Sequence, residues 1–122
     1  MVIVVDDDFR VREALESLLK SAEFSSVAFS SAEDLLESGF LAEASCVITD
    51  VCMPGMQGLE LQRRIKREYP KLPVIMITGN RREQTRQRAL SEGAAAFFYK
   101  PLDPGDLLRS VYLAMSDSEK DI

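Results

Sequence analysis

The sequence has no histidine, no tryptophan and only two cysteines, Cys46 and Cys52. Without histidine or a Cys-x-x-Cys pair it lacks the usual ligands of a zinc site, and two cysteines are too few for a secreted disulfide framework. No apolar run approaches the roughly 18 residues that span a bilayer. The short apolar run Val2–Val5 is followed at once by three aspartates, unlike a signal peptide. These absences favour a soluble cytoplasmic protein with reduced thiols and no membrane partner.

Positive charge is also in short supply, because 15 Lys and Arg residues face 20 Asp and Glu residues, for a net charge of −5. Lys and Arg contacts to phosphate supply most nucleic-acid affinity, so we expect no direct DNA or RNA binding by this domain. A length of 122 residues with 46% hydrophobic and 29% charged residues fits one globular domain. We predict that domain over residues 1–116, followed over 117–122 by a polar tail or the start of a linker.

Short apolar runs alternate along the chain with stretches of helical spacing. The sequence predicts strands over Val2–Val5, Val27–Phe29, Cys46–Thr49, Val74–Ile77 and Ala94–Tyr99. It predicts helices after Asp8, from Ser30 or Ser31 to about Leu41, from about Leu59 to Tyr69, over Arg81–Glu92, and from Pro104, capped by Asp103, to about Met115. Because the strands are apolar throughout, they predict a parallel sheet covered on both faces, which is a doubly wound, three-layer α/β fold.

Polar residues stand at the ends of these predicted strands. Asp6 and Asp7 follow the first strand, Asp50 the third, Thr78 the fourth and Lys100 the fifth. Ligands of open parallel sheets lie beyond the carboxyl ends of the strands, so we expect these side chains to converge. Clustered carboxylates raise one another's pKa and favour a cation, and oxygen ligands with room for water suit Mg²⁺.

The same residues indicate a covalent role for a carboxylate. With no histidine and no serine paired with a base, the strongest candidate for a covalent event is a carboxylate attacking a phosphoryl group, and Asp50 is the central one. Lys100 would pair with a carboxylate at rest and with a phosphoryl oxygen afterwards, and Thr78 adds a hydroxyl donor.

Four motifs occur in order along the chain, namely Val5-Asp6-Asp7, the block from Thr49 to Leu61, Ile77-Thr78-Gly79 and Lys100-Pro101. Together they resemble the receiver domain of bacterial two-component response regulators over essentially the whole chain. The sequence of the central block is similar to that of regulators of the FixJ and NarL type, whose receivers control a helix-turn-helix DNA-binding module. The resemblance implies a CheY-like, flavodoxin-like (βα)₅ fold with strand order 2-1-3-4-5.

The resemblance also implies a role for each motif residue. Asp50 would accept a phosphoryl group from a sensor histidine kinase or phosphotransfer protein, and Lys100 would bind that group. Asp7 would ligate Mg²⁺ directly, Asp6 mainly through water, and Asp50 and the backbone carbonyl of Cys52 would complete the ligands. The implied function is a phosphorelay switch that controls transcription through an output domain outside this chain, not an enzyme beyond slow self-dephosphorylation.

Further implied features concern switching. Thr78 would move toward the phosphoryl group as Phe97 turns inward, and Cys52 and Asn80 would tune the lifetime of the phosphoryl group. The Lys100–Pro101 peptide is expected to be cis. A homodimer through the face of the fourth helix, fifth strand and fifth helix is a further expectation.

Simpler interpretations stay open for some residues. Phe97 also fits a plain core position, and Cys52 an ordinary exposed thiol with no redox role. The arginines of the fourth predicted helix fit a solvated surface better than a partner surface.

Three other functions compete. A Mg²⁺-dependent phosphohydrolase commonly has a second aspartate two residues beyond its nucleophile, where this chain has Cys52. A flavodoxin-like cofactor module would need a hydroxyl- or glycine-rich loop where three aspartates stand. A receiver-like interaction domain that has lost phosphorylation would not be expected to keep Asp50, Thr78 and Lys100.

Overall fold

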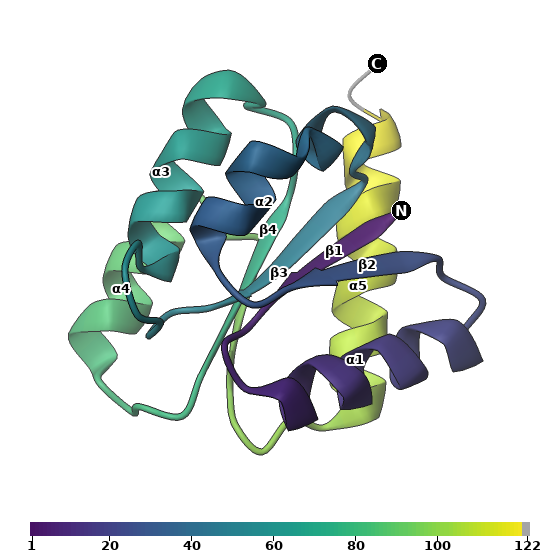
Figure 1. The fold of residues 1–122 in the computed structure, drawn as a ribbon, viewed down its shortest axis with the longest axis horizontal. Coiled ribbons are helices and arrows are strands. Elements are labelled where there is room, and N and C mark those ends of the chain that lie inside the picture. Colours follow the sequence, from purple (N-terminus) through teal and green to yellow (C-terminus); the bar gives the residue numbers. More distant parts are fainter. Residues whose placement is uncertain (121–122) are drawn as a thin grey trace.

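The computed structural model describes residues 1–120 of the chain, and the side chains of residues 1–116. Within that part, five strands alternate with five α-helices (Figure 1). The strands are β1 (Val2–Val5), β2 (Ser26–Phe29), β3 (Cys46–Asp50), β4 (Val74–Thr78) and β5 (Ala96–Tyr99). The helices are α1 (Phe9–Ser21), α2 (Ala32–Ser38), α3 (Gly58–Glu68), α4 (Glu83–Ser91) and α5 (Pro104–Lys120), with a 3₁₀ helix, η1 (Phe40–Glu43), after α2.

The strands form one parallel sheet in the order β2-β1-β3-β4-β5, which confirms the predicted fold. The register pairs Val5 with Thr49, and Asp50 with Ile77. The carboxyl ends of β1, β3 and β4 therefore lie side by side at one edge of the sheet.

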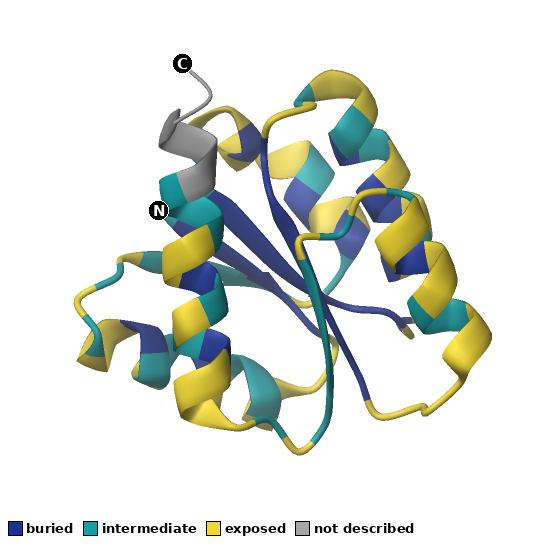
Figure 2. Cartoon of the chain, turned by 180° about the vertical axis from the view of Figure 1, so that it is seen from behind, coloured by how far each residue is buried: buried dark blue, intermediate teal, exposed yellow. Residues whose placement is uncertain are grey.

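Both faces of the sheet are covered by helices, with α1 and α5 on one face and α2, α3 and α4 on the other (Figure 1). Alternate strand residues therefore enter two separate cores: Val4 and Ile48 pack with α1 and α5, whereas Ile3 and Val47 pack with the other three helices. Every residue of β1, β3 and β4 is buried, while the edge strands β2 and β5 are half-buried (Figure 2). Double coverage explains why the strand sequences show no polar alternation.

Side-chain caps begin three of the helices. Asp8 accepts a hydrogen bond from the Arg10 N–H at 2.9 Å, and Asp103 accepts one from the Asp106 N–H at 3.0 Å. At α2 the cap is Ser31 and not Ser30, because the Ser31 hydroxyl oxygen accepts a hydrogen bond from the Asp34 N–H at 3.1 Å. Each cap satisfies an N–H group that has no partner within its own helix.

Some predicted boundaries were wrong. The second helix ends at Ser38 and not near Leu41, because Gly39 takes a left-handed conformation at φ 80° and a 3₁₀ helix follows. The strand predicted from Ala94 begins only at Ala96.

The last helix is longer than predicted. It continues to Lys120, since neither glycine nor proline follows Gly105 to end it. Residues 121–122 of the predicted tail lie outside the described part, and the domain boundary at 116 stays a prediction. None of the helices described is long and apolar enough to cross a membrane.

Candidate functional site

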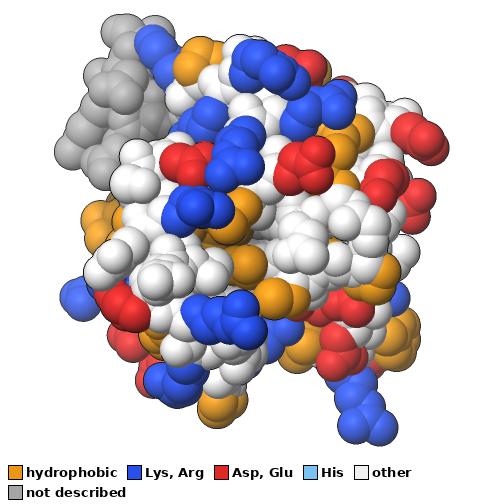
Figure 3. Space-filling model, turned by 90° about the vertical axis from the view of Figure 1, so that its left-hand side faces the viewer, with side chains coloured by type: hydrophobic (Ala, Val, Ile, Leu, Met, Phe, Trp, Pro, Cys, Tyr) orange, Lys and Arg blue, Asp and Glu red, His pale blue; other side chains and the backbone are white. Residues whose placement is uncertain are grey.

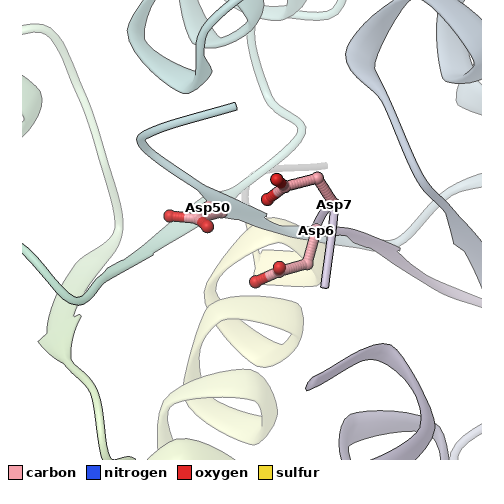
Figure 4. Close-up of side chains that lie close together, drawn as sticks. All are labelled: Asp6, Asp7 and Asp50. Carbon is pink, nitrogen blue, oxygen red and sulfur yellow. The ribbon is translucent and has the colours of Figure 1, made fainter. Parts of the chain in front are cut away.

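Three carboxylates meet at the carboxyl edge of the sheet. Asp6 and Asp7 follow β1 and Asp50 ends β3, and one oxygen from each lies within 4.8 Å of the others (Figure 4). Asp6 is fully buried and Asp50 is 5% exposed, whereas Asp7 is exposed. The convergence that the sequence predicted is therefore present, with one carboxylate open to solvent.

Lys100 links two of these carboxylates. Its Nζ donates to Asp6 Oδ2 at 2.9 Å and to Asp50 Oδ2 at 3.1 Å. Its backbone N–H donates to the Thr78 carbonyl oxygen at 2.8 Å, which fixes the end of β5 beside the end of β4. The peptide bond from Lys100 to Pro101 is cis.

The electrostatics of the site favour an additional cation. Burial is the largest cause of a raised pKa of Asp50, and the charge of Asp6 is the next largest. Lys100 and the Cys52 N–H lower that pKa but do not cancel these two effects. Burial alone would lower the pKa of Lys100, but its bonds to the two carboxylates outweigh burial and raise that pKa. One lysine thus stays charged beside three carboxylates that it does not fully compensate.

The two oxygens of the Asp6 carboxylate are both engaged. Oδ2 accepts from Lys100, as above, and Oδ1 accepts from the Asp8 N–H at 2.9 Å. The Asp6 carbonyl oxygen also accepts from the Arg12 guanidinium at 2.7 Å, and that guanidinium lies over the Phe9 ring. Asp6 is therefore held in place, and Asp7 is the carboxylate most accessible to a ligand from solvent.

The residues predicted to switch lie on β4 and β5, the two strands beyond β3. Thr78 is buried at the end of β4, and its Oγ1 accepts from the N–H of Asn80, an exposed residue, at 3.1 Å. Phe97 is half-buried in β5, packs against the core under α2, α3 and α4, and meets the Tyr99 ring edge to face at 5.5 Å. These positions agree with a core role for Phe97 as well as with a switch role.

The two cysteines differ in environment. Cys46 is buried in β3, and burial raises the pKa of its thiol to about 12. Cys52 is exposed, and its backbone N–H donates to Asp50 Oδ1 at 3.2 Å. The backbone at Cys52 is therefore in direct contact with the Asp50 carboxylate.

Gly58 is a site residue to which the sequence analysis gave no role. A Cβ atom at Gly58 would lie 2.3 Å from the Asp50 carbonyl oxygen and 2.9 Å from the Val51 Cα. The Gly58 N–H also donates to the Val51 carbonyl oxygen at 2.9 Å. Only glycine lets α3 begin this close to the Asp50 backbone, and the sole sequence indication was its place in the central motif block.

Comparison with known proteins agrees with this geometry. The model of the response regulator receiver domain family matches residues 2–112. The chain is 36% identical to nodulation protein W of Bradyrhizobium diazoefficiens over 98% of this chain and 53% of that protein. It is 35% identical to the transcriptional regulatory protein FixJ of Azorhizobium caulinodans over 96% of this chain and 56% of that protein. The chain thus spans about half the length of these curated relatives.

Solved structures show the same fold. A receiver domain protein from Clostridium thermocellum superposes with a TM-score of 0.92 and 26% identity, covering 99% of this chain and 98% of its own. The crystal structure of FixJ-N superposes with a TM-score of 0.83 and 30% identity, covering 94% of this chain and 92% of its own. Sequence family, fold and acidic site agree, and the chain belongs to the response regulator receiver domain family of phosphoacceptor signalling domains.

Proposed function

We propose that Asp50 accepts a phosphoryl group from the phosphohistidine of a sensor kinase or phosphotransfer protein. The observation that carries this proposal is the bridge from Lys100 Nζ to both Asp6 and Asp50. It supplies a charged donor beside a nearly buried carboxylate, at the sheet edge where α/β proteins bind ligands.

We propose Mg²⁺ as the cofactor of the site. The carboxylates of Asp6, Asp7 and Asp50, together with the Cys52 carbonyl, would hold it as implied by the family. The donor set fits, because it consists of hard oxygen atoms, carries excess negative charge, and includes an exposed member at which water ligands can remain. When bound, Mg²⁺ supplies positive charge that offsets the charge of the phosphoryl oxygens.

In the transfer step an Asp50 carboxylate oxygen attacks phosphorus. A new O–P bond forms, the P–N bond to the donor imidazole breaks, and its electron pair remains on the imidazole nitrogen. Asp50 must be ionised to attack, and the Lys100 ammonium that donates to its Oδ2 favours the ionised form. Lys100 then exchanges its bond to Asp50 for one to a phosphoryl oxygen, a charge-assisted bond of about 1.5–3 kcal/mol.

The switch would involve Thr78 and Phe97. Thr78 would turn from the Asn80 N–H toward the phosphoryl group, and Phe97 would move into the space released. Moving an equilibrium from mostly off to mostly on takes about 5.5 kcal/mol. The two new bonds replace resting bonds of Lys100 and Thr78, so their net gain supplies only part of this energy, and a partner specific to the on state supplies the remainder. Cys52 and Asn80 flank the site and would set the lifetime of the phosphoryl group.

The output would be control of transcription through a domain outside residues 1–122, in keeping with the relative FixJ, which is a transcriptional regulatory protein. We further propose a signalling domain in the cytoplasm that does not itself bind DNA and is not an enzyme beyond slow self-dephosphorylation. A homodimer through α4, β5 and α5 is supported by exposed hydrophobic side chains on two of these elements, Leu90 on α4 and Tyr112 and Leu113 on α5.

The test is the intact mass of the protein after incubation with acetyl phosphate, in Mg²⁺ or in EDTA, for the wild type and for Asp50→Asn. We expect one phosphoryl adduct on the wild type in Mg²⁺ only, and none on the variant. Absence of an adduct, with Mg²⁺ binding shown separately, would instead indicate an interaction domain that does not take a phosphoryl group.

A further inference from the structure

A contact outside the acidic cluster ties α2 to the loop that follows Asp50. Glu33, in the first turn of α2, accepts a hydrogen bond at its Oε2 from the Met56 N–H, at 2.9 Å. Met56 lies in the loop between β3 and α3, 23 positions further along the chain. The bond therefore joins a helix without any proposed site residue to the loop that contains Cys52.

Gly55, the residue before Met56, leaves room for the Glu33 carboxylate. Gly55 has a left-handed φ of 75°, and a Cβ atom there would lie 2.3 Å from Glu33 Oε2. The Glu33 carboxylate thus occupies the space in which a side chain of residue 55 would lie. The Met56 N–H is the largest cause of a lowered pKa of Glu33, so the carboxylate accepts as an anion at neutral pH.

The loop is fixed near its two ends by other contacts. At its start the Cys52 N–H donates to Asp50 Oδ1, and the Val51 carbonyl accepts from the Gly58 N–H at its end. The contact from Glu33, at the Met56 N–H, lies between these two along the chain. It therefore adds a hydrogen bond to the loop backbone that the contacts at the ends do not provide.

We infer that Glu33 is a positioning residue for the Mg²⁺ site, acting through the Met56 N–H on the loop that presents the Cys52 carbonyl. The inference rests on the proposed function, in which that carbonyl is a ligand. A loop released from Glu33 must be ordered when the cation binds, and this ordering weakens binding without changing the ligands.

The test is the Mg²⁺ dependence of phosphorylation by acetyl phosphate in Glu33→Ala, Glu33→Gln and Glu37→Ala. Glu37→Ala is the matched control, because it removes the same charge from an exposed position of α2. We expect Glu33→Ala to raise the half-saturating Mg²⁺ concentration about three- to tenfold, as loss of one exposed charge-assisted bond would, with the rate at saturating Mg²⁺ nearly unchanged. Glu33→Gln keeps an acceptor oxygen and should stay close to the wild type.

Two results would overturn the inference. Equal half-saturating concentrations for Glu33→Ala and Glu37→Ala would show that the contact does not position the loop. An equal loss in Glu33→Gln and Glu33→Ala would show an effect of charge alone. Direct Mg²⁺ titration of the same variants keeps the test independent of phosphorylation, so a wild type that binds Mg²⁺ but takes no phosphoryl group refutes only the proposed function.

Discussion

Replacing Gly58 by alanine would place a methyl group against the backbone that carries the proposed phosphoacceptor. The new Cβ would lie 2.3 Å from the Asp50 carbonyl oxygen and 2.9 Å from the Val51 Cα. Both atoms belong to the backbone at the end of the central strand β3, so no flexible side chain can move away. Relief to an ordinary contact of 3.4 Å requires a shift of about 1 Å in α3 or in the Asp50 backbone.

The cost of this shift follows from known overpacking effects. Inserting a methyl group into a packed site destabilises the folded protein by about 1–3 kcal/mol. Replacing glycine by alanine also stabilises the protein by about 0.4–1 kcal/mol, because it restricts the unfolded chain. The net loss is about 1–2 kcal/mol, and a domain of this size loses roughly 4 °C in Tm per kcal/mol. A displacement of about 1 Å at a nucleophile can also lower its reaction rate on the order of a hundredfold.

The assay compares Gly58→Ala with Gly79→Ala by thermal unfolding and by the rate of labelling with acetyl phosphate. Gly79 is the matched control, because nothing lies within 4 Å of a Cβ atom there. We expect a Tm lower by about 4–8 °C and slower labelling for Gly58→Ala only. Equal Tm values and equal rates for the two variants would refute the close approach of α3 to Asp50.

Three further predictions concern the acidic cluster. The pKa of Asp50 is raised on folding, so its ionised carboxylate lowers the stability of the fold above that pKa. Asp50→Asn should therefore raise Tm near neutral pH, and this gain should disappear as the pH falls toward 3.8, the ordinary pKa of an aspartate. A gain in Tm that does not depend on pH would contradict this. Lys100→Met leaves the carboxylates of Asp6 and Asp50 without their cation. Urea unfolding near neutral pH should show a free energy of unfolding lower by about 1–3 kcal/mol, and this loss should shrink in acid, where the carboxylates are protonated. A loss that is the same in acid would argue against repulsion between the two carboxylates. Mg²⁺ at about 100 times its Kd should stabilise the protein by about 2.7 kcal/mol, which corresponds to roughly 10 °C in Tm. EDTA or the substitution Asp7→Asn should remove this stabilisation. An unchanged Tm shift in Asp7→Asn would exclude Asp7 as a ligand.

Local sequence patterns were sufficient for the fold class and for the cluster, whereas the strand order came from the resemblance to receiver domains. The apolar runs before Asp6, Asp50 and Thr78 predicted strands, and parallel strands end at the same edge, so convergence followed without knowledge of any contact. The cap at Asp8 was predictable for the same reason, because its hydrogen bond goes to an N–H two residues away. Lys100 could be placed in the cluster because it stands at the end of a strand.

Contacts between distant segments were not predictable in this way. The bond from Glu33 to Met56 and the approach of Gly58 to Asp50 depend on where α2 and α3 begin in space, to within about 1 Å. The early end of α2 depends on the left-handed conformation of Gly39, which single-sequence periodicity does not reveal. The switch proposed for Thr78 and Phe97 would involve a second conformation of the chain.

The most direct measurement of the central claim is chemical localisation of the phosphoryl group. Protein labelled with acetyl phosphate in Mg²⁺ is treated with borohydride, which reduces an aspartyl phosphate to homoserine, and is then digested for peptide mass spectrometry. Our account predicts homoserine at position 50 and unmodified aspartate at positions 6 and 7. Homoserine at position 6 or 7, or labelled protein without homoserine at position 50, would contradict it.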